Sequence, residues 1–280
     1  MSKFVGSKVS KLYGAYRPVV SDALITTVLG YLNENIPSAS LTCMTDVGCG
    51  TGLSTARFAI FLPEHTRIIG FDSSPTQIEE ARLTNSKTNI EYTVHDQSDG
   101  LPSGDSELDL VTTVQAAHWF DLDSFFAECK RVLKPDGVLA IISYPGPKME
   151  VPGQPQTVNE QLSARINKLD SDLDSMGYWH PSIRNRLKKQ YRGFELPFEQ
   201  QICYRDDESL YYRKAVKLGD YLTFLETWSG VRNYRKQHPD APLMAEFKQS
   251  LFSLMPTGSD ENAEVIQVFP WFLIMCRKDK

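Results

Sequence analysis

The stretch DVGCGTG, residues 46–52, places three glycines directly after an apolar run and directly before a helix-like segment. Glycine permits positive φ and lets a ligand approach the backbone closely, so such a turn is suited to hold a nucleotide. A plain strand-to-helix turn is the structural alternative. Leu53 stands where the dinucleotide fingerprint has its last glycine, and no lysine follows Gly52 as the phosphate loop requires.

Two carboxylates follow at positions that suit a nucleoside. The apolar run 66–72 ends in Asp72, which can accept hydrogen bonds from both ribose hydroxyls. The next run, 89–96, ends in Asp96, whose carboxylate can accept a bond from an adenine amino group. The turn and both acids fall at the carboxyl ends of successive strands, which is where open α/β sheets bind ligands.

Apolar runs alternate with helical patterns over the first half of the chain. This order predicts an α/β fold with a doubly wound, mostly parallel sheet. A helix is also expected before the first strand, over 21–35, with Ser21 as its N-cap. The expected strands span 42–47, 66–72, 89–96, 107–115 and 137–145, and the expected helices between them span 54–62, 74–85 and 122–135, the last ended by Pro135.

After Pro145 the pattern changes, because four prolines fall within residues 145–155 and indicate a linker or hinge. Helices are expected over 156–193 and 207–253, a strand over 198–205, and one long strand over 263–278 with Pro270 at a bulge or an edge. The basic run 184–192 predicts a solvated helix face, with contact to an acidic partner as the alternative. We therefore expect one domain, with residues 1–40 as an arm and helix, 41–145 as the core, and 146–280 as helical lid insertions plus the last two strands.

Composition narrows the function classes. The net charge of −5 gives no electrostatic footprint for nucleic acid, and no apolar run reaches the roughly 18 residues of a membrane span. Five widely spaced cysteines, without a CxxC pair, predict reduced thiols in a cytoplasmic protein without a metal site. A monomer or weak homodimer is expected.

The motifs DVGCGTG, GFDSS, HDQSDGLP, DLVTTVQAAHWFD and CKRVLKPDGVLAI occur in the order typical of one family. Over residues 40–145 the chain resembles the class I S-adenosylmethionine-dependent methyltransferases. The resemblance implies a seven-stranded sheet whose antiparallel last strand lies between the fifth and sixth, formed here by 198–205 and 263–278. It also implies S-adenosylmethionine as cofactor, bound by Tyr13, Arg17, Asp46, Gly48, Cys49, Gly50, Gly52, Asp72, Ser73, Asp96, Gln97, Gln115 and Ala116.

Three further stretches, YGAYRP, QAAHWFD and FLETWSGVRNYRKQHP, are similar to the trans-aconitate methyltransferase group and its animal relatives. That resemblance implies methyl-ester formation on a small carboxylic acid. A carboxylate is already ionised at pH 7, so it can attack the methyl carbon without a protein base. The residues expected to orient the acid are Tyr16, His118, Trp119, Trp228 and Arg232, with Tyr144 beside them.

Other functions remain open. A hydroxyl or nitrogen acceptor on a lipid-like or xenobiotic molecule needs a base, and His118 is the best candidate, with a titration expected near pH 6 to 7. A nucleoside-binding protein without turnover is a second alternative, and an oxidoreductase is a third. Trp228 and Arg232 are four residues apart and share a helix face, as either a lid over the acceptor or a helix docked on the sheet.

Overall fold

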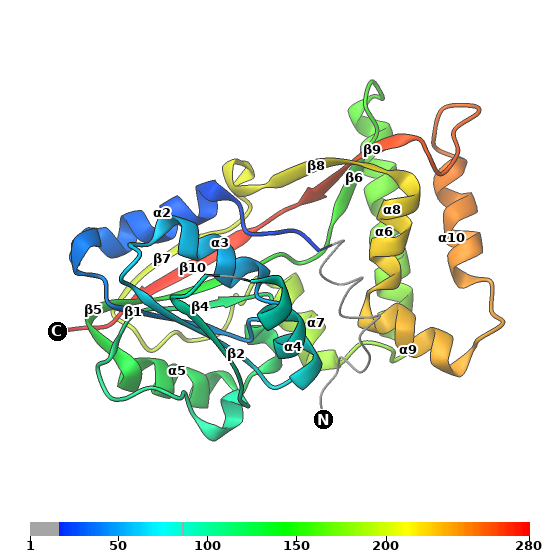
Figure 1. Ribbon diagram of the computed structural model, residues 1–280. Coiled ribbons are helices and arrows are strands. Elements are labelled where there is room, and N and C mark those ends of the chain that lie inside the picture. The colour runs from blue at the N-terminus through cyan, green and yellow to red at the C-terminus, as the bar shows by residue number, and fades with distance from the viewer. Residues whose placement is uncertain (1–16, 86) are drawn as a thin grey trace.

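The computed structural model describes residues 17–85 and 87–280, so Tyr13 and Tyr16 lie outside the described residues. One sheet contains β1 (Cys43–Val47), β2 (Arg67–Asp72), β3 (Ile90–Val94), β4 (Leu108–Val114), β5 (Leu133–Ser143), β7 (Gln200–Tyr204) and β10 (Phe272–Arg277). Its order is β3-β2-β1-β4-β5-β10-β7, and β10 runs antiparallel to both of its neighbours, β5 and β7 (Figure 1). The predicted α/β fold with a mostly parallel seven-stranded sheet and an inserted antiparallel strand is confirmed.

Four helices of the first half cover the sheet: α2 (Asp22–Asn33), α3 (Leu53–Phe61), α4 (Pro75–Thr84) and α5 (Leu122–Val132). Successive strand residues point to opposite faces, and the central strands therefore contribute to two cores. Met44 and Leu110 belong to a core with α2 and α3, whereas Val111 packs with Phe125 of α5 in the other. Ser21 accepts the Leu24 backbone N–H, which confirms the expected cap of α2.

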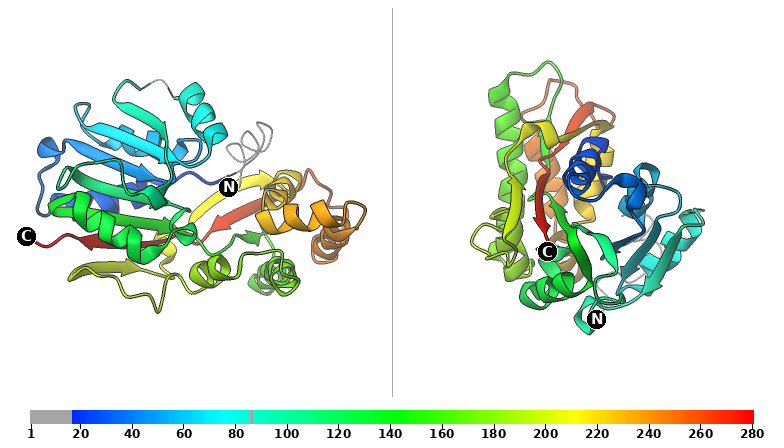
Figure 2. Two further views of the ribbon diagram at one scale, coloured as in Figure 1. Left: turned by 90° about the horizontal axis from the view of Figure 1, so that it is seen from below. Right: turned by 90° about the vertical axis from the view of Figure 1, so that its left-hand side faces the viewer.

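The second half of the chain builds a cap beside the sheet (Figures 1 and 2). Within the cap, β6, β9 and β8 form a separate three-stranded antiparallel sheet. The cap comprises β6 (Lys148–Glu150), α6 (Gln156–Ser175), β8 (Tyr212–Lys217), α8 (Leu218–Glu226), α9 (Ser229–Gln237), α10 (Leu243–Phe252) and β9 (Glu264–Phe269). A further helix, α7 (Pro181–Lys188), precedes β7 and lies against the turn that follows β4.

Three expected elements need correction. The long strand over 263–278 is two strands in different sheets, with Pro270 between β9 and β10, because proline offers no N–H to a ladder. The segment 207–253 is not purely helical, since β8 pairs with β9 in the cap sheet. Finally, α5 ends at Val132 and not at Pro135, because Leu133 already pairs with Leu108 of β4.

All five cysteines are free thiols, and Cys203 is the exposed one. Within residues 17–85 and 87–280, none of the helices combines the length and the apolar composition needed to cross a membrane. In the same residues, no cluster of three or more His, Cys, Asp or Glu side chains is arranged to hold a metal ion.

Candidate active site

The glycine turn connects β1 to α3, and each of its three positions favours glycine for a different physical reason. All three have positive φ, a backbone conformation that residues with a side chain rarely adopt. A Cβ on Gly48 would lie 2.5 Å from the Ala116 Cβ, and one on Gly52 would lie 2.4 Å from the Tyr92 hydroxyl. At Gly50 the nearest atom would be Gln77 Oε1 at 3.7 Å. Gly50 therefore leaves open space beside the turn, whereas the other two allow close packing.

That open space is a hollow at the carboxyl ends of β1, β2 and β4, with a volume of about 110 Å³. Asp72 lines it, and its two carboxylate oxygens accept the backbone N–H groups of Gly50 at 3.1 Å and Ser74 at 2.9 Å. Burial raises the pKa of the Asp72 carboxyl, against the lowering effect of these two hydrogen bonds. Gln77 Oε1 is buried at the hollow and has no hydrogen-bond partner among the described residues.

Asp46 lies behind the hollow and does not line it. Its fully buried carboxylate accepts the Thr55 hydroxyl at 2.6 Å and the Thr112 hydroxyl at 2.8 Å, which ties β1 to α3 and β4. Burial raises its pKa to about 6, although both hydrogen bonds act in the opposite direction. In this position Asp46 supports the glycine turn through α3 and does not face the open space.

The other expected cofactor residues divide into two groups. The residues that line the hollow are Arg17, Gly48, Cys49, Gly50, Asp72, Gln115 and Ala116. Ser73, Gly52, Asp96 and Gln97 do not line it. Asp96 is exposed and caps a short 3₁₀ helix by accepting the Ser98 N–H at 3.0 Å, and hydrogen bonds from Ser98 lower its pKa. Sequence reasoning missed Gln77 and Trp271, which both lie on the wall.

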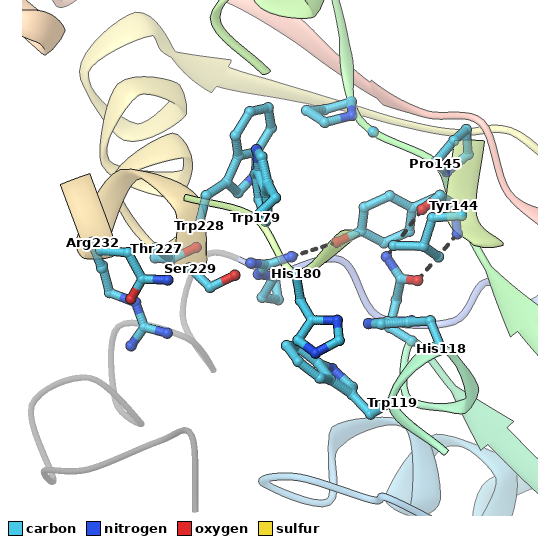
Figure 3. Close-up of a pocket in the computed structure, with 16 residues that line it drawn as sticks. His118, Trp119, Tyr144, Pro145, Trp179, His180, Thr227, Trp228, Ser229 and Arg232 are labelled. Atoms are coloured by element: carbon cyan, nitrogen blue, oxygen red, sulfur yellow. Dashed lines mark hydrogen bonds between the residues drawn. The ribbon is translucent and has the colours of Figure 1, made fainter. Parts of the chain in front are cut away.

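A larger cavity of about 360 Å³ adjoins the hollow. Four residues line both spaces: Arg17, Gln115, Trp119 and Tyr144. The Gln115 side chain donates to the Tyr144 carbonyl at 3.2 Å and accepts the Tyr144 N–H at 3.4 Å, so it joins the ends of β4 and β5 (Figure 3). Gln115 has φ of 51°, an uncommon conformation for a residue other than glycine, and functional sites often contain such residues.

Aromatic and cationic side chains from both halves of the chain line this cavity (Figure 3). Arg17 donates to the Tyr144 hydroxyl at 2.9 Å and lies over the Phe224 ring at 5.1 Å. His118 is buried with its ring 5.4 Å from that of Trp119. From the cap side come Trp228 and Arg232, as the lid interpretation requires, together with Trp179, His180, Thr227, Ser229 and Asn233, which sequence reasoning did not single out.

Helix α7 is attached to the turn that carries His118 and Trp119. Arg186 donates to the backbone carbonyl of Phe120 at 2.6 Å and lies 3.3 Å from that of His118. The prediction that 184–192 is a solvated helix face is therefore wrong at Arg186, whose guanidinium donates hydrogen bonds to backbone carbonyls of the turn that carries His118. The run includes this inward arginine because α7 lies against the sheet side of the cavity.

Comparison with known proteins identifies the class. The profile of the methyltransferase domain family matches residues 45–141. A candidate methyltransferase of Dictyostelium discoideum is 30% identical over 97% of this chain and 94% of its own length. A solved candidate type II methyltransferase from Anaeromyxobacter dehalogenans is 26% identical, with a TM-score of 0.71 over 95% of this chain and 100% of that one. The chain belongs to the class I S-adenosylmethionine-dependent methyltransferases.

One group of relatives has an assigned acceptor. The malonyl-[acyl-carrier protein] O-methyltransferase of Dechloromonas aromatica is 32% identical, but the match covers only 40% of each chain.

In the methyltransferase described here, the hollow fits the nucleoside of the methyl donor. A carboxylate stands at the carboxyl end of β2, Gly50 leaves its side-chain space empty, and Gln77 offers a buried acceptor without a partner among the described residues.

Proposed function

We propose that this methyltransferase transfers the methyl group of S-adenosylmethionine to a carboxylate oxygen of a small organic acid. The observation that carries the proposal is the pair of adjoining spaces. One has the carboxylate and glycine turn suited to a nucleoside, and the other has aromatic walls with Arg17 and Arg232. The junction at Gln115, Trp119 and Tyr144 is where methyl group and acceptor would meet. The predicted trans-aconitate resemblance and the name of the malonyl relative agree with an acid as acceptor.

On the donor side, we assign Asp72 to the ribose hydroxyls, because its carboxylate lines the hollow and keeps lone pairs beyond those used by Gly50 and Ser74. Gly48, Gly50, Cys49 and the Gln115–Ala116 turn form the surrounding wall. The role of Asp46 is to hold α3 and the turn in place. Adenine contacts by Asp96 and Gln97, and cofactor contacts by Ser73, Gly52 and Tyr13, stay predictions.

On the acceptor side, Arg17 and Arg232 supply positive charge at a cavity that is also lined by four large aromatic side chains, Trp119, Tyr144, Trp179 and Trp228. A guanidinium binds a carboxylate through parallel hydrogen bonds, and the apolar walls strengthen this attraction by excluding water. S-adenosylmethionine supplies a methyl group that is already electrophilic. The protein therefore needs to orient the carboxylate and exclude water, and it needs no residue to remove a proton. The predicted contribution of Tyr16 concerns a residue outside the described part.

A hydroxyl or nitrogen acceptor is the second candidate, and the position of His118 favours it. The His118 ring lines the acceptor cavity next to Trp119, within the turn that also borders the donor hollow. An acceptor with a proton to lose needs a base at this place, and histidine is the residue most often used. With either acceptor we infer a small-molecule substrate, a cytoplasmic location, a monomer or weak homodimer, and one working domain completed by β7 and β10.

The experiment that tests the proposal is methyl transfer from isotopically labelled S-adenosylmethionine to a panel of small acids and matched alcohols and amines. We expect label in base-labile methyl esters, with a rate that changes little between pH 6 and 8, because carboxylates are ionised throughout that range. His118→Asn should leave the weak pH dependence of this rate unchanged, because a carboxylate acceptor has no proton for His118 to remove. Transfer confined to alcohols or amines, lost in His118→Asn, would instead establish the second candidate.

A further inference from the structure

A third space, in addition to the donor hollow and the acceptor cavity, lies beyond the segment Pro145–Pro147. This segment forms one wall of the acceptor cavity. The third space has a volume of about 430 Å³ and lies between this segment and helix α6. Pro145, Gly146, Pro147 and Trp228 line both this space and the acceptor cavity. We call it the distal compartment. The two spaces are thus separated by three residues of chain and one indole ring, and not by a packed layer of side chains.

Gly146 is the residue of the partition without a side chain. A Cβ built on it would meet no atom within 4 Å apart from its two chain neighbours, so a side chain at this position would enter open space. The flanking residues Pro145 and Pro147 have no backbone N–H, which leaves the segment with few donors that need a partner. An apolar chain can lie against such a backbone at little cost, whereas an unpaired strand edge would present several N–H groups without partners. The segment is suited to be the floor of a continuous groove.

The distal compartment has mixed walls. Pro147, Ile166 and Pro270 give it apolar surface, and Asn167 and Ser171 of α6 add polar groups. Lys188 of α7 also lines it, at 3.5 Å from the buried carboxylate of Asp170. Apolar surface next to the partition and hydrogen-bonding groups from two helices fit an extended organic molecule better than a compact ion.

We propose that the acceptor is an elongated acid that occupies both the acceptor cavity and the distal compartment. Its carboxylate lies at the junction near Gln115 and Tyr144, its apolar body passes Gly146, and its far end lies in the distal compartment between α6 and the proline segment. This inference rests on the proposed function, since it takes the acceptor to be an acid in the larger cavity. It adds that chain length determines affinity and that the partition residues determine which lengths fit.

The test uses linear saturated acids from butanoate to decanoate as probes, with methyl transfer and calorimetric binding measured for each in the presence of donor or S-adenosylhomocysteine. We expect KM and Kd to fall by about threefold to fourfold for each buried methylene until the distal compartment is filled. Gly146→Leu places a side chain in the open passage, and should raise the KM for decanoate by at least about tenfold. The ratio of the KM for decanoate to that for butanoate should rise by at least about threefold, because butanoate does not reach the partition.

Gly30→Leu is the matched control, because a Cβ at Gly30 also meets nothing within 4 Å and the position is exposed on α2, away from both spaces. It should leave every acid unchanged. If butanoate is methylated but affinity does not rise with length, or if Gly146→Leu weakens all acids equally, the elongated acceptor is wrong while the carboxylate function stands. If no acid is bound or methylated although S-adenosylhomocysteine binds, the proposed function itself fails and this inference falls with it.

Discussion

Removal of the negative charge at Asp72 is the most direct test of the donor site. The carboxylate has about four lone-pair positions, and the Gly50 and Ser74 N–H groups occupy one on each oxygen. Two positions remain for ligand donors, which matches the two hydroxyls of a ribose. In Asp72→Asn, an amide NH₂ replaces one oxygen and offers donors where acceptors are needed. The variant should lose at least one charge-assisted hydrogen bond to the nucleoside.

The magnitude follows from the strength of such bonds. A hydrogen bond to a charged group contributes about 1.5 to 3 kcal/mol, so Asp72→Asn should weaken S-adenosylhomocysteine binding by about tenfold to 150-fold. Part of this loss could come from the glycine turn, because Gly50 also loses its charged acceptor. A second ligand that lacks both ribose hydroxyls separates the two causes. For wild-type protein, removal of the hydroxyls should cost a similar factor, whereas for Asp72→Asn it should cost less than about threefold.

Isothermal titration calorimetry of both proteins with both ligands completes this double-mutant cycle, and thermal unfolding checks that the variant is folded. A coupling above about 1 kcal/mol supports the ribose assignment. The reasoning is refuted if the hydroxyls contribute the same factor to binding in Asp72→Asn as in wild-type protein. In that case Asp72 would act on the ligand only by shaping the turn at Gly50.

Two further predictions concern residues behind the cavity walls. Because the pKa of Asp46 is raised from 3.8 to about 6, its contribution to stability is present below pH 4 and is lost as pH rises through 6. Urea unfolding should show that Asp46→Asn removes up to about 3 kcal/mol of this decline, and an unchanged slope between pH 4 and 6 would contradict it. Arg186→Gln should raise the acceptor KM about tenfold, because the lost hydrogen bonds hold the backbone of His118 and Phe120. The affinity for S-adenosylhomocysteine should change little, and Arg186→Lys should recover part of the loss in KM. Equal effects on the acceptor and on S-adenosylhomocysteine would refute this prediction.

The donor half of the fold could be predicted because its signals are local. The strands are short runs with many apolar residues, helical patterns follow the first, second and fourth of them, and the glycines mark the turn after the first strand. The directions of the side chains were harder to predict from the sequence. Asp46 and Asp72 both stand at the carboxyl ends of strands, yet only Asp72 lines the hollow. Direction depends on strand register and on partners such as Thr55 and Thr112, which a single sequence does not display.

The C-terminal half was harder because its pairings are non-local. A proline inside an apolar stretch is consistent with a bulge, an edge or a break, and at Pro270 the strand leaves one sheet for another. β8 has four exposed residues and two of intermediate exposure, with no strict alternation, so its sequence pattern does not distinguish it from the neighbouring helices. Its partner β9 lies beyond three helices, α8 to α10, and no turn signal connects the two strands.

The residues that line the acceptor cavity were also difficult to identify from the sequence. Arg17 and Tyr144 meet across 127 residues of sequence, and Trp179 joins Trp228 from a loop that carries no recognisable motif. The family profile ends at residue 141, before Tyr144 and before the cap residues that line the cavity. Similarity within that profile therefore covers the donor hollow and the turn with His118 and Trp119, but not Tyr144 or the cap residues of the acceptor cavity. Relatives with the same acceptor should be sought by their match to Gly146, Arg186 and Trp228 rather than to the glycine turn.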